Sequence, residues 1–323
     1  MQVFRQLSEI PPGYGPAIVS VGNFDGIHRA HRHMLEQIVK RAKEQRAVSV
    51  AVTFNPHPAR YLRPGSSLKL LTPEPEKLRL FAETGLDAVG LLPFAEEMRL
   101  TTAHDFAAKI LRDALHTLEI HEGFNFRFGN KGAGDIHTLT EFGREFGFEV
   151  FSYPEMSLRG MEVSSSAIRK LLHDGQVHLA RHLLGRVFSV LSSPVHGRGY
   201  GSKYTVPTIN LASYSELVPQ NGVYVSRTRV GDETFDSVTN VGNRPTFGAE
   251  SFAIETHLLD FHPVDLSEDT EVEVFFLRRL RAEIKFSSPE ALREQIGNDV
   301  RAARRYQRLR VMLGRPSLPR KAE

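Results

Sequence analysis

The sequence predicts an α/β protein in two parts: a parallel sheet with helices on both faces, then a small antiparallel β-barrel with a terminal helix. In the first half, apolar strand-like runs alternate with amphipathic helical runs. Near Gly185 this alternation stops, and short β-branched and aromatic runs separated by Gly, Pro and Asn follow. A length of 323 residues suits about two domains, which we place at residues 1–184 and 185–323.

Strand and helix patterns alternate along the first half. We expect strands at residues 17–21, 47–54, 88–92, near 121 and at 148–153, and helices at 31–46, 75–84, 102–115 and 135–146. This alternation favours a parallel sheet, in which binding sites collect at the carboxyl ends of the strands. The candidate motifs of this half all fall at such ends.

The second half contains shorter strand-like runs, at residues 222–230, 235–241, 252–259 and 271–276. Turn residues between them are typical of an antiparallel barrel or sandwich. A last helix should begin at Ser288, which is a good N-cap, with Pro289 in its first turn. The linker at residues 174–186 looks partly helical.

The composition excludes cysteine-based sites and argues against a membrane-spanning segment. The chain has no cysteine, which excludes disulfides, thiolate zinc sites and cysteine nucleophiles. No signal-peptide pattern and no apolar run of about 20 residues is present, so we expect a soluble cytoplasmic protein without a membrane partner.

The basic residues do not by themselves indicate a nucleic-acid partner. The net charge of +3 is small, and the basic excess gathers near the C-terminus, at Arg301, Arg304, Arg305, Arg308 and Arg310. We favour a solvated helix face over a nucleic-acid contact there. The sequence does not indicate an oligomeric state.

The first motif is Gly22-Asn23-Phe24-Asp25-Gly26, which joins an expected strand to an expected helix. A glycine turn before a helix N-terminus is a ready phosphate site. His28 and His31 follow at helical spacing, so both can reach one bound anion. The alternatives are a pair of surface histidines, or a zinc site that also uses His33.

Two further segments of the first half have both structural and functional interpretations. Ser164, Ser165 and Ser166 precede an expected helix that carries Arg169, and hydroxyls there either cap the helix or bind phosphate. Asn55-Pro56-His57-Pro58 ends the second strand, where its prolines alone would explain a rigid turn.

The first motif resembles the HxGH nucleotidyltransferase signature in the form used by FAD synthetases. Independently, Val206-Pro207-Thr208-Ile209-Asn210-Leu211, Asn221-Gly222-Val223-Tyr224 and Ile254-Glu255-Thr256-His257 resemble riboflavin kinase. The ordered set, over residues 19–299, resembles the bacterial bifunctional riboflavin kinase/FAD synthetase (FMN adenylyltransferase) family. This resemblance implies a Rossmann-like nucleotidyltransferase domain and a riboflavin kinase barrel. It also implies the conversion of riboflavin to FMN and of FMN to FAD, with ATP and Mg²⁺.

The resemblance assigns roles in the adenylyltransferase half. It implies that His28, His31 and Arg169 act on the phosphates. Nucleotide-binding residues are then Gly22, Phe24, Asp25, Gly26, Ser164, Ser165 and Ser166, and flavin-binding residues are Asn55, Pro56, His57 and Asn125. The chain departs from the family pattern at Ala30, where glycine is usual, and at Asn125, where many relatives carry aspartate.

In the kinase half the resemblance implies that Glu255 is the base that accepts the ribityl hydroxyl proton. Asn240 then contacts the flavin, and Thr208 and Asn210 are magnesium ligands. Taken alone, these are an exposed strand carboxylate and turn residues. ATP phosphates would be covered by Gly197, Gly199, Gly201 and Lys203.

The kinase half also departs from the family pattern. Ile209 replaces an alanine, and Ser202 and Thr205 stand where the family has arginine and glycine. The second change should weaken ATP binding unless Lys203 offsets it.

Two alternative functions remain at this stage. One is an enzyme that retains a single activity, with the kinase weakened. The other is a flavin-nucleotide sensor whose basic tail contacts nucleic acid. The presence of His28, His31 and Glu255 argues against a pure sensor.

Overall fold

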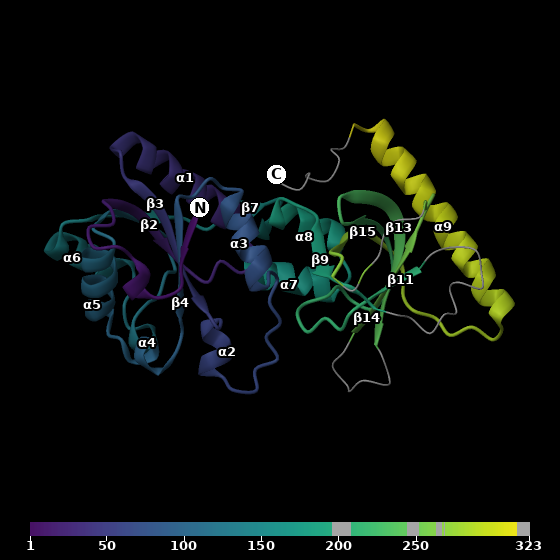
Figure 1. Cartoon of the computed structure of the whole chain (residues 1–323), viewed down its shortest axis with the longest axis horizontal. Helices are drawn as coiled ribbons and strands as arrows, with labels where there is room; N and C mark the ends of the chain where they lie inside the picture. Colours follow the sequence, from purple (N-terminus) through teal and green to yellow (C-terminus); the bar gives the residue numbers. More distant parts are fainter. Residues whose placement is uncertain (196–207, 244–251, 263–266, 268, 315–323) are drawn as a thin grey trace. The chain divides into compact units, whose positions relative to one another are not determined.

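The computed structural model describes residues 1–195, 208–243, 252–262, 267 and 269–314. The chain divides into two compact units, Met1–Ser165 and Ser166–Glu323. Figure 1 shows the first unit in purple to blue and the second in teal to yellow. The boundary that the sequence analysis places at 184/185 stays a prediction.

The first unit is built on a six-stranded sheet in which every strand pair is parallel. The strands lie in the order β1-β4-β3-β2-β5-β6. They are β1 (Gln2–Phe4), β2 (Ala17–Val21), β3 (Val48–Asn55), β4 (Ala88–Pro93), β5 (Thr117–Gly123) and β6 (Glu149–Tyr153). The central strands β2, β3 and β4 are mostly apolar and are buried on both faces, as a sheet covered on both sides requires.

Helices cover both faces of this sheet. On one face α1 (Arg29–Gln45) and α3 (Glu74–Ala82) pack on side chains such as Ile18 and Val89. On the other face lies a core that includes Val19, Val50 and Ile120. This core contains residues of α5 (Ala103–Phe106), the π-helical segment η2 (Ala107–Ala114) and α6 (Ile136–Phe146).

Short elements connect these layers. They are η1 (Leu7–Glu9), α2 (Pro58–Leu62), α4 (Glu96–Leu100), η3 (Asn130–Gly132) and the hairpin of β7 (Ser157–Leu158) with β8 (Met161–Glu162).

The boundary between the units falls at the start of α7 (Ser165–His173), and α8 (Val177–Leu184) follows in the second unit. A seven-stranded antiparallel sheet follows, in the order β10-β11-β14-β13-β12-β15-β9. Its strands are β9 (Phe188–Ser192), β10 (Pro194–Val195), β11 (Thr208–Leu211), β12 (Gly222–Val230), β13 (Glu233–Asn243), β14 (Phe252–Leu258) and β15 (Val272–Arg281).

The sheet of the second unit curls into a barrel. Its two outer strands, β9 and β10, are separated in the chain by Ser193 alone, so the two edges of the sheet lie together. The terminal helix α9 (Pro289–Met312), yellow in Figure 1, is capped by Ser288. It packs through Ala303 on residues such as Val225 and Phe275. The predicted fold class is confirmed in both units.

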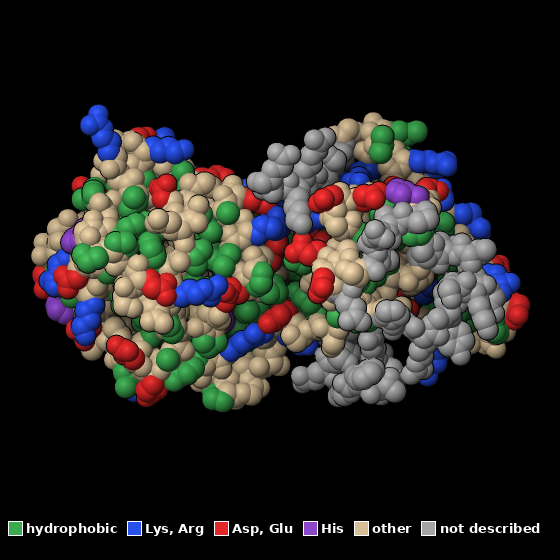
Figure 2. All heavy atoms as spheres, viewed as in Figure 1, with side chains coloured by type: hydrophobic (Ala, Val, Ile, Leu, Met, Phe, Trp, Pro, Cys, Tyr) green, Lys and Arg blue, Asp and Glu red, His purple; other side chains and the backbone are tan. Residues whose placement is uncertain are grey.

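The basic C-terminal segment is part of α9. Arg301, Arg304, Arg305 and Arg308 are exposed, whereas Arg310 is buried. Figure 2 shows basic side chains spread along this helix. Four of the five arginines are therefore solvent-exposed, whereas Arg310 is not part of the predicted solvated face.

Candidate active sites

The loop after β2 has an unusual backbone that its sequence explains. Phe24, Gly26 and Ile27 have φ values of 46°, 89° and 33°. Glycine tolerates such angles, but Phe24 and Ile27 are held there by burial in the core, at 1% and 0% exposure. A Cβ at Gly22 would lie 3.3 Å from the Phe24 ring, which explains the small residue at that position.

The loop after β2 is hydrogen-bonded to Leu71 and Thr72, which precede α3. The Asp25 carboxylate, 1% exposed, accepts backbone N–H groups from Leu71 at 3.1 Å and from Thr72 at 3.0 Å. In return, the backbone N–H of Gly26 donates to the Thr72 hydroxyl at 2.9 Å. Asp25 therefore orders the loop through hydrogen bonds inside the protein.

His28 and His31 lie together at the start of α1. His28 is the N-cap residue, one position before the first helical residue, and not part of the first turn as the sequence suggests. Its Nδ1 accepts the backbone N–H of His31 at 3.4 Å, and the two rings stack at 3.7 Å between centroids. A neutral His28 therefore carries its proton on Nε2, where it can donate to a ligand.

The environment of His31 favours its neutral form. Burial lowers the pKa of His31 well below its usual value, and the neighbouring His28 and Lys77 act in the same direction. Its Nδ1 is buried and has no hydrogen-bond partner among the described residues. A buried ring nitrogen left in this way is ready for a ligand group.

The loops that follow β3 and β5 lie at the same edge of the sheet as the loop after β2, because β3, β2 and β5 are neighbouring parallel strands. Asn55 ends β3 and donates to Glu74, while His57 caps α2 by accepting the Ala59 N–H at 3.1 Å. Asn125 follows β5 and is exposed.

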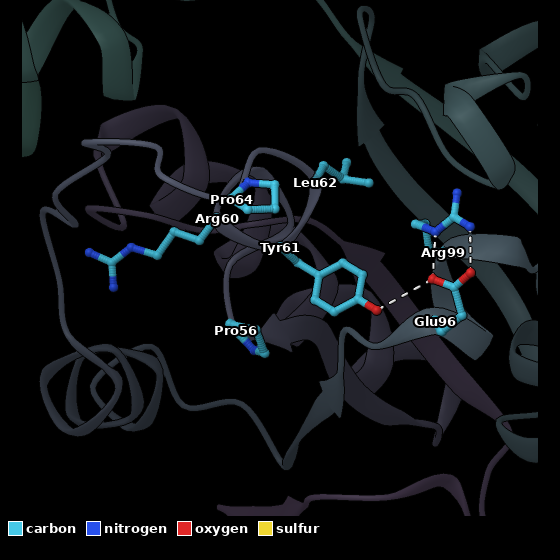
Figure 3. A pocket seen from close by; sticks show the side chains of 7 residues that line it. All are labelled: Pro56, Arg60, Tyr61, Leu62, Pro64, Glu96 and Arg99. Carbon is cyan, nitrogen blue, oxygen red and sulfur yellow. Dashed lines mark hydrogen bonds and ion pairs between the residues drawn. The ribbon is translucent and has the colours of Figure 1, made fainter.

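A hollow of about 800 Å³ opens beside the Asn55–His57 turn (Figure 3). In it, the Tyr61 hydroxyl lies 3.4 Å from Glu96, and Glu96 accepts from Arg99 at 2.7 Å. Its lining residues are Pro56, Arg60, Tyr61, Leu62, Pro64, Glu96 and Arg99. Of these, the sequence analysis singled out Pro56 alone.

The serine motif is connected to the first loop. The Ser165 hydroxyl donates to the backbone carbonyl of Asp25 at 2.8 Å. Ser164 precedes α7 and Ser166 is exposed on it, while Arg169 follows Ser165 by about one helical turn. Ser165 therefore has a structural contact in addition to its predicted role.

In the second unit three predicted residues stand in one row across the sheet. Glu255 on β14 pairs with Asn210 on β11 and with Asn240 on β13. Residues paired directly across strands share a face, so these three side chains are neighbours. Glu255 is exposed, while Ile254 and Thr256 on either side of it are buried.

Thr208 is two residues before Asn210 and so lies on the same face of β11. Its hydroxyl lies 3.4 Å from Nδ1 of His257, and burial lowers the pKa of His257. Thr208 and Asn210 thus offer two neutral oxygens beside Glu255. That donor set suits a magnesium ion held mainly by nucleotide phosphates and water.

Several positions that the sequence analysis discusses lie outside the described residues, among them Val206 and Pro207 of the kinase motif. The same holds for Ser202, Thr205 and the positions proposed for the ATP phosphates, which are Gly197, Gly199, Gly201 and Lys203.

The zinc alternative has no support. Within the described part of the chain, no three His, Cys, Asp or Glu side chains are grouped so that they could hold a metal ion. His33 instead packs its ring against Tyr153, with centroids 6.0 Å apart.

No helix in the described part of the chain is long and apolar enough to span a bilayer.

Sequence reasoning missed Lys77. It lies on the buried face of α3 with Leu80 and Phe81, at 4% exposure. The sequence did contain a signal for its burial. Lys77 precedes Leu80 and Phe81 by three and four residues, which places a lysine on the apolar face of an amphipathic helix.

Comparison with known proteins finds two family models in this chain. One, described as FAD synthetase, matches residues 12–167, and the other, described as riboflavin kinase, matches residues 184–307. Each therefore falls largely within one of the two structural units.

Similar proteins extend over nearly the whole chain. The bifunctional riboflavin kinase/FMN adenylyltransferase of Pseudomonas fluorescens is 34% identical and covers 94% of this chain and 97% of that protein. The protein of the same name from Escherichia coli strain K12 is 32% identical, covering 90% and 92%.

A similar solved structure is described as a macrolide-efflux protein from Streptococcus pneumoniae. It has a TM-score of 0.84 and 28% identity, and the match covers 94% of this chain and 98% of that one. The identity and coverage of the relatives establish the family: this chain belongs to the bifunctional riboflavin kinase/FMN adenylyltransferases.

Proposed function

We propose that this chain phosphorylates riboflavin to FMN with one ATP and then adenylylates FMN with a second ATP, giving FAD and pyrophosphate. The observation that carries the proposal is that each unit presents its own motif at an edge or face of its own sheet. The His28–His31 pair stands after β2, and the Asn210–Glu255–Asn240 row crosses β11, β14 and β13.

For adenylyl transfer, an oxygen of the FMN phosphate attacks the α-phosphorus of ATP and the bond to pyrophosphate breaks. No covalent enzyme intermediate is needed, so positioning and charge stabilisation suffice. His28 donates through Nε2 and His31 through its ring N–H, beside the N-terminus of α1, which favours negative charge. Arg169 binds the β- and γ-phosphates, and Ser164 and Ser166 donate hydroxyl hydrogens to them.

The remaining predicted residues of the first unit shape the two substrate sites. Asn55, Pro56, His57 and Asn125 stand on the flavin side, and Pro56 also lines the hollow beside this turn. Gly22 and Gly26 allow close approach of the nucleotide. Phe24 and Asp25 are buried, so they act through the shape of the loop.

For riboflavin phosphorylation, Glu255 accepts the proton of the ribityl 5′-hydroxyl. The hydroxyl oxygen then attacks the γ-phosphorus, and ADP leaves. Asn240, beside Glu255, orients the flavin. Thr208 and Asn210 would hold Mg²⁺, which when bound neutralises phosphate charge.

Two parts of this proposal rest on the sequence alone. Gly197, Gly199, Gly201 and Lys203 are proposed to cover the ATP phosphates of the kinase. Cytoplasmic location also stays a prediction.

The proposal is tested by incubating the protein with riboflavin and ATP–Mg²⁺ and separating FMN from FAD by chromatography. Both products should form in sequence. Glu255→Gln keeps the side-chain shape but is not basic, so riboflavin phosphorylation should fall by about 100-fold or more, while added FMN should still become FAD.

Glu233→Gln is the matched control, since Glu233 is an exposed glutamate on the neighbouring strand β13. Its kinase rate should be unchanged. A Glu255→Gln rate within about threefold of the parent, a barrier change under roughly 1 kcal/mol, would remove Glu255 from the base role.

A further inference from the structure

Lys77 is a buried cation directly behind the His28–His31 site. Its ammonium Nζ donates to the backbone carbonyl of Asn23 at 2.8 Å, in the loop that leads to the histidines. The Thr53 hydroxyl donates to the same carbonyl at 3.3 Å. Lys77 and Thr53 therefore hold Asn23 in place, the residue that directly follows Gly22.

Lys77 has no carboxylate in direct contact with its ammonium group in the described part of the chain. Among those residues, the bond to Asn23 is its one hydrogen bond. Burying an unpaired ammonium is costly, so its presence calls for an explanation.

The groups around Lys77 and His31 come from three elements. His28 and Lys77 face His31, and Asp25 and Glu74 act on Lys77. Burial lowers the pKa of Lys77, while Asp25 and Glu74 favour its charged form. The strands beneath, β2, β3 and β4, carry no charged residue. The positive charge of Lys77 thus acts on His31 as well as on the carboxylates of Asp25 and Glu74.

Two independent features of this small region suit an anion. One is the buried ammonium of Lys77, which has no ion pair in direct contact, and the other is the buried Nδ1 of His31, which lacks a hydrogen-bond partner in the described structure. The helix N-terminus of α1 lies beside both.

We propose that Lys77 is a positioning residue for adenylyl transfer: its buried ammonium fixes the Asn23 carbonyl and supplies a positive charge behind the histidine pair, which the nucleotide phosphates complement. The proposal rests on the adenylyltransferase function proposed above. Lys77 acts through the loop and through His31, without itself touching the reacting atoms.

The test uses the full chain with Lys77→Met, which keeps the length of the side chain and removes its charge and donor. FAD formation from FMN should fall about 10- to 100-fold, as expected for loss of a charged hydrogen bond. Riboflavin phosphorylation should be unchanged. The acid limb of the pH profile of FAD formation should move to higher pH, because removing a neighbouring cation raises the pKa of His31.

A direct titration of the His31 ring by NMR gives a readout that does not depend on turnover. The pKa of His31 should rise in both Lys77→Met and Lys77→Gln relative to the parent. Lys77→Gln retains an N–H donor for Asn23, so it should keep more FAD formation than Lys77→Met. Arg79→Gln, on the more exposed side of α3, is the matched control and should change neither quantity.

Failure of the proposed function and failure of the Lys77 inference give different results. If the parent protein forms no FAD, the proposed function fails, whereas the NMR titration still tests Lys77. The inference is overturned if FAD formation by Lys77→Met stays within threefold of the parent, or if it falls with no change in the pKa of His31. If Lys77→Met does not fold, Lys77→Gln is judged by the same two criteria.

Discussion

At the scale of single residues, Glu122 shows how one buried group affects stability. It lies on β5 at 2% exposure, and the backbone N–H of Val21 donates to it. Within the described structure it has no ion-pair partner. Burial therefore raises the pKa of Glu122 well above its usual value, and the Val21 hydrogen bond only partly opposes this.

Glu122→Gln should stabilise the first unit at neutral pH. A carboxyl group whose pKa is raised in the folded state stabilises the fold below its unfolded pKa near 4.5, and this contribution is lost as pH rises through the folded pKa. Glutamine keeps an acceptor for Val21 and has no charge to bury. An unsatisfied buried group costs about 1–3 kcal/mol, which corresponds to roughly 2–10 °C in Tm.

Thermal unfolding of Glu122→Gln and the parent at pH 5 and pH 8 measures this effect. The gain in Tm should be larger at pH 8, and Glu141→Gln, at an exposed position on α6, should show no such dependence. An equal gain at both pH values, or a loss at pH 8, would contradict the assignment.

Residue-level prediction from the sequence is strongest where a motif is continuous. The His28–His31 pair is recognisable because both residues follow a glycine turn in one short run. Lys77 and Thr72 are not, since their contacts with Asn23 and Gly26 connect segments about 50 residues apart. Only the fold brings them to the loop.

At the scale of elements, a local signal predicts the start of α9, whereas the strands β1, β9 and β11 were not expected from the sequence. Ser288 caps α9 by accepting the Ala291 N–H at 3.2 Å, as the Ser-Pro pair indicates. The π-helical register of η2 was not predicted, because its apolar spacing is that of an ordinary helix.

The interior of the barrel contains a cluster that periodicity could not identify. Five fully buried hydroxyl groups hydrogen-bond to one another at 2.7–2.9 Å. They belong to Ser226, Thr228, Ser237, Thr239 and Thr256. Such polar residues are usually expected on the exposed face of a strand, and only the mutual hydrogen bonds make their burial acceptable.

The contacts of α7 and α8 with the barrel indicate where a fragment that folds by itself should begin. The Leu172 carbonyl accepts from the Gln220 N–H at 2.9 Å, and a Cβ at Gly175 would lie 2.6 Å from Arg279. Val177 and Leu183 on α8 are fully buried. A fragment of residues 166–323 should therefore fold and phosphorylate riboflavin.

A fragment of residues 184–323, which follows the boundary expected from sequence, lacks these side chains. Each buried valine or leucine contributes about 1.5–3 kcal/mol, so this fragment should be markedly less stable. Thermal unfolding and kinase assays on the two fragments provide the comparison. Equal stability and activity would show that α7 and α8 are dispensable for the barrel.

At the scale of the whole molecule, the change of pattern near Gly185 predicts the two architectures, a parallel sheet and a curled antiparallel sheet. It does not locate the helices α7 and α8, which look like the helices of the first half but cluster with the barrel. The His28–His31 pair lies in the first unit and the Asn210–Glu255–Asn240 row lies in the second, so the two activities should be separable by substitution at these residues.

The most direct test of this separation is the double variant His28→Ala/His31→Ala, assayed for both products in the full chain. His33→Ala serves as control, because His33 is exposed on the same helix. The account predicts that FAD formation falls by about 100-fold or more, while riboflavin is still phosphorylated at the parental rate. A folded double variant that still makes FAD, or that loses both products equally, would contradict it.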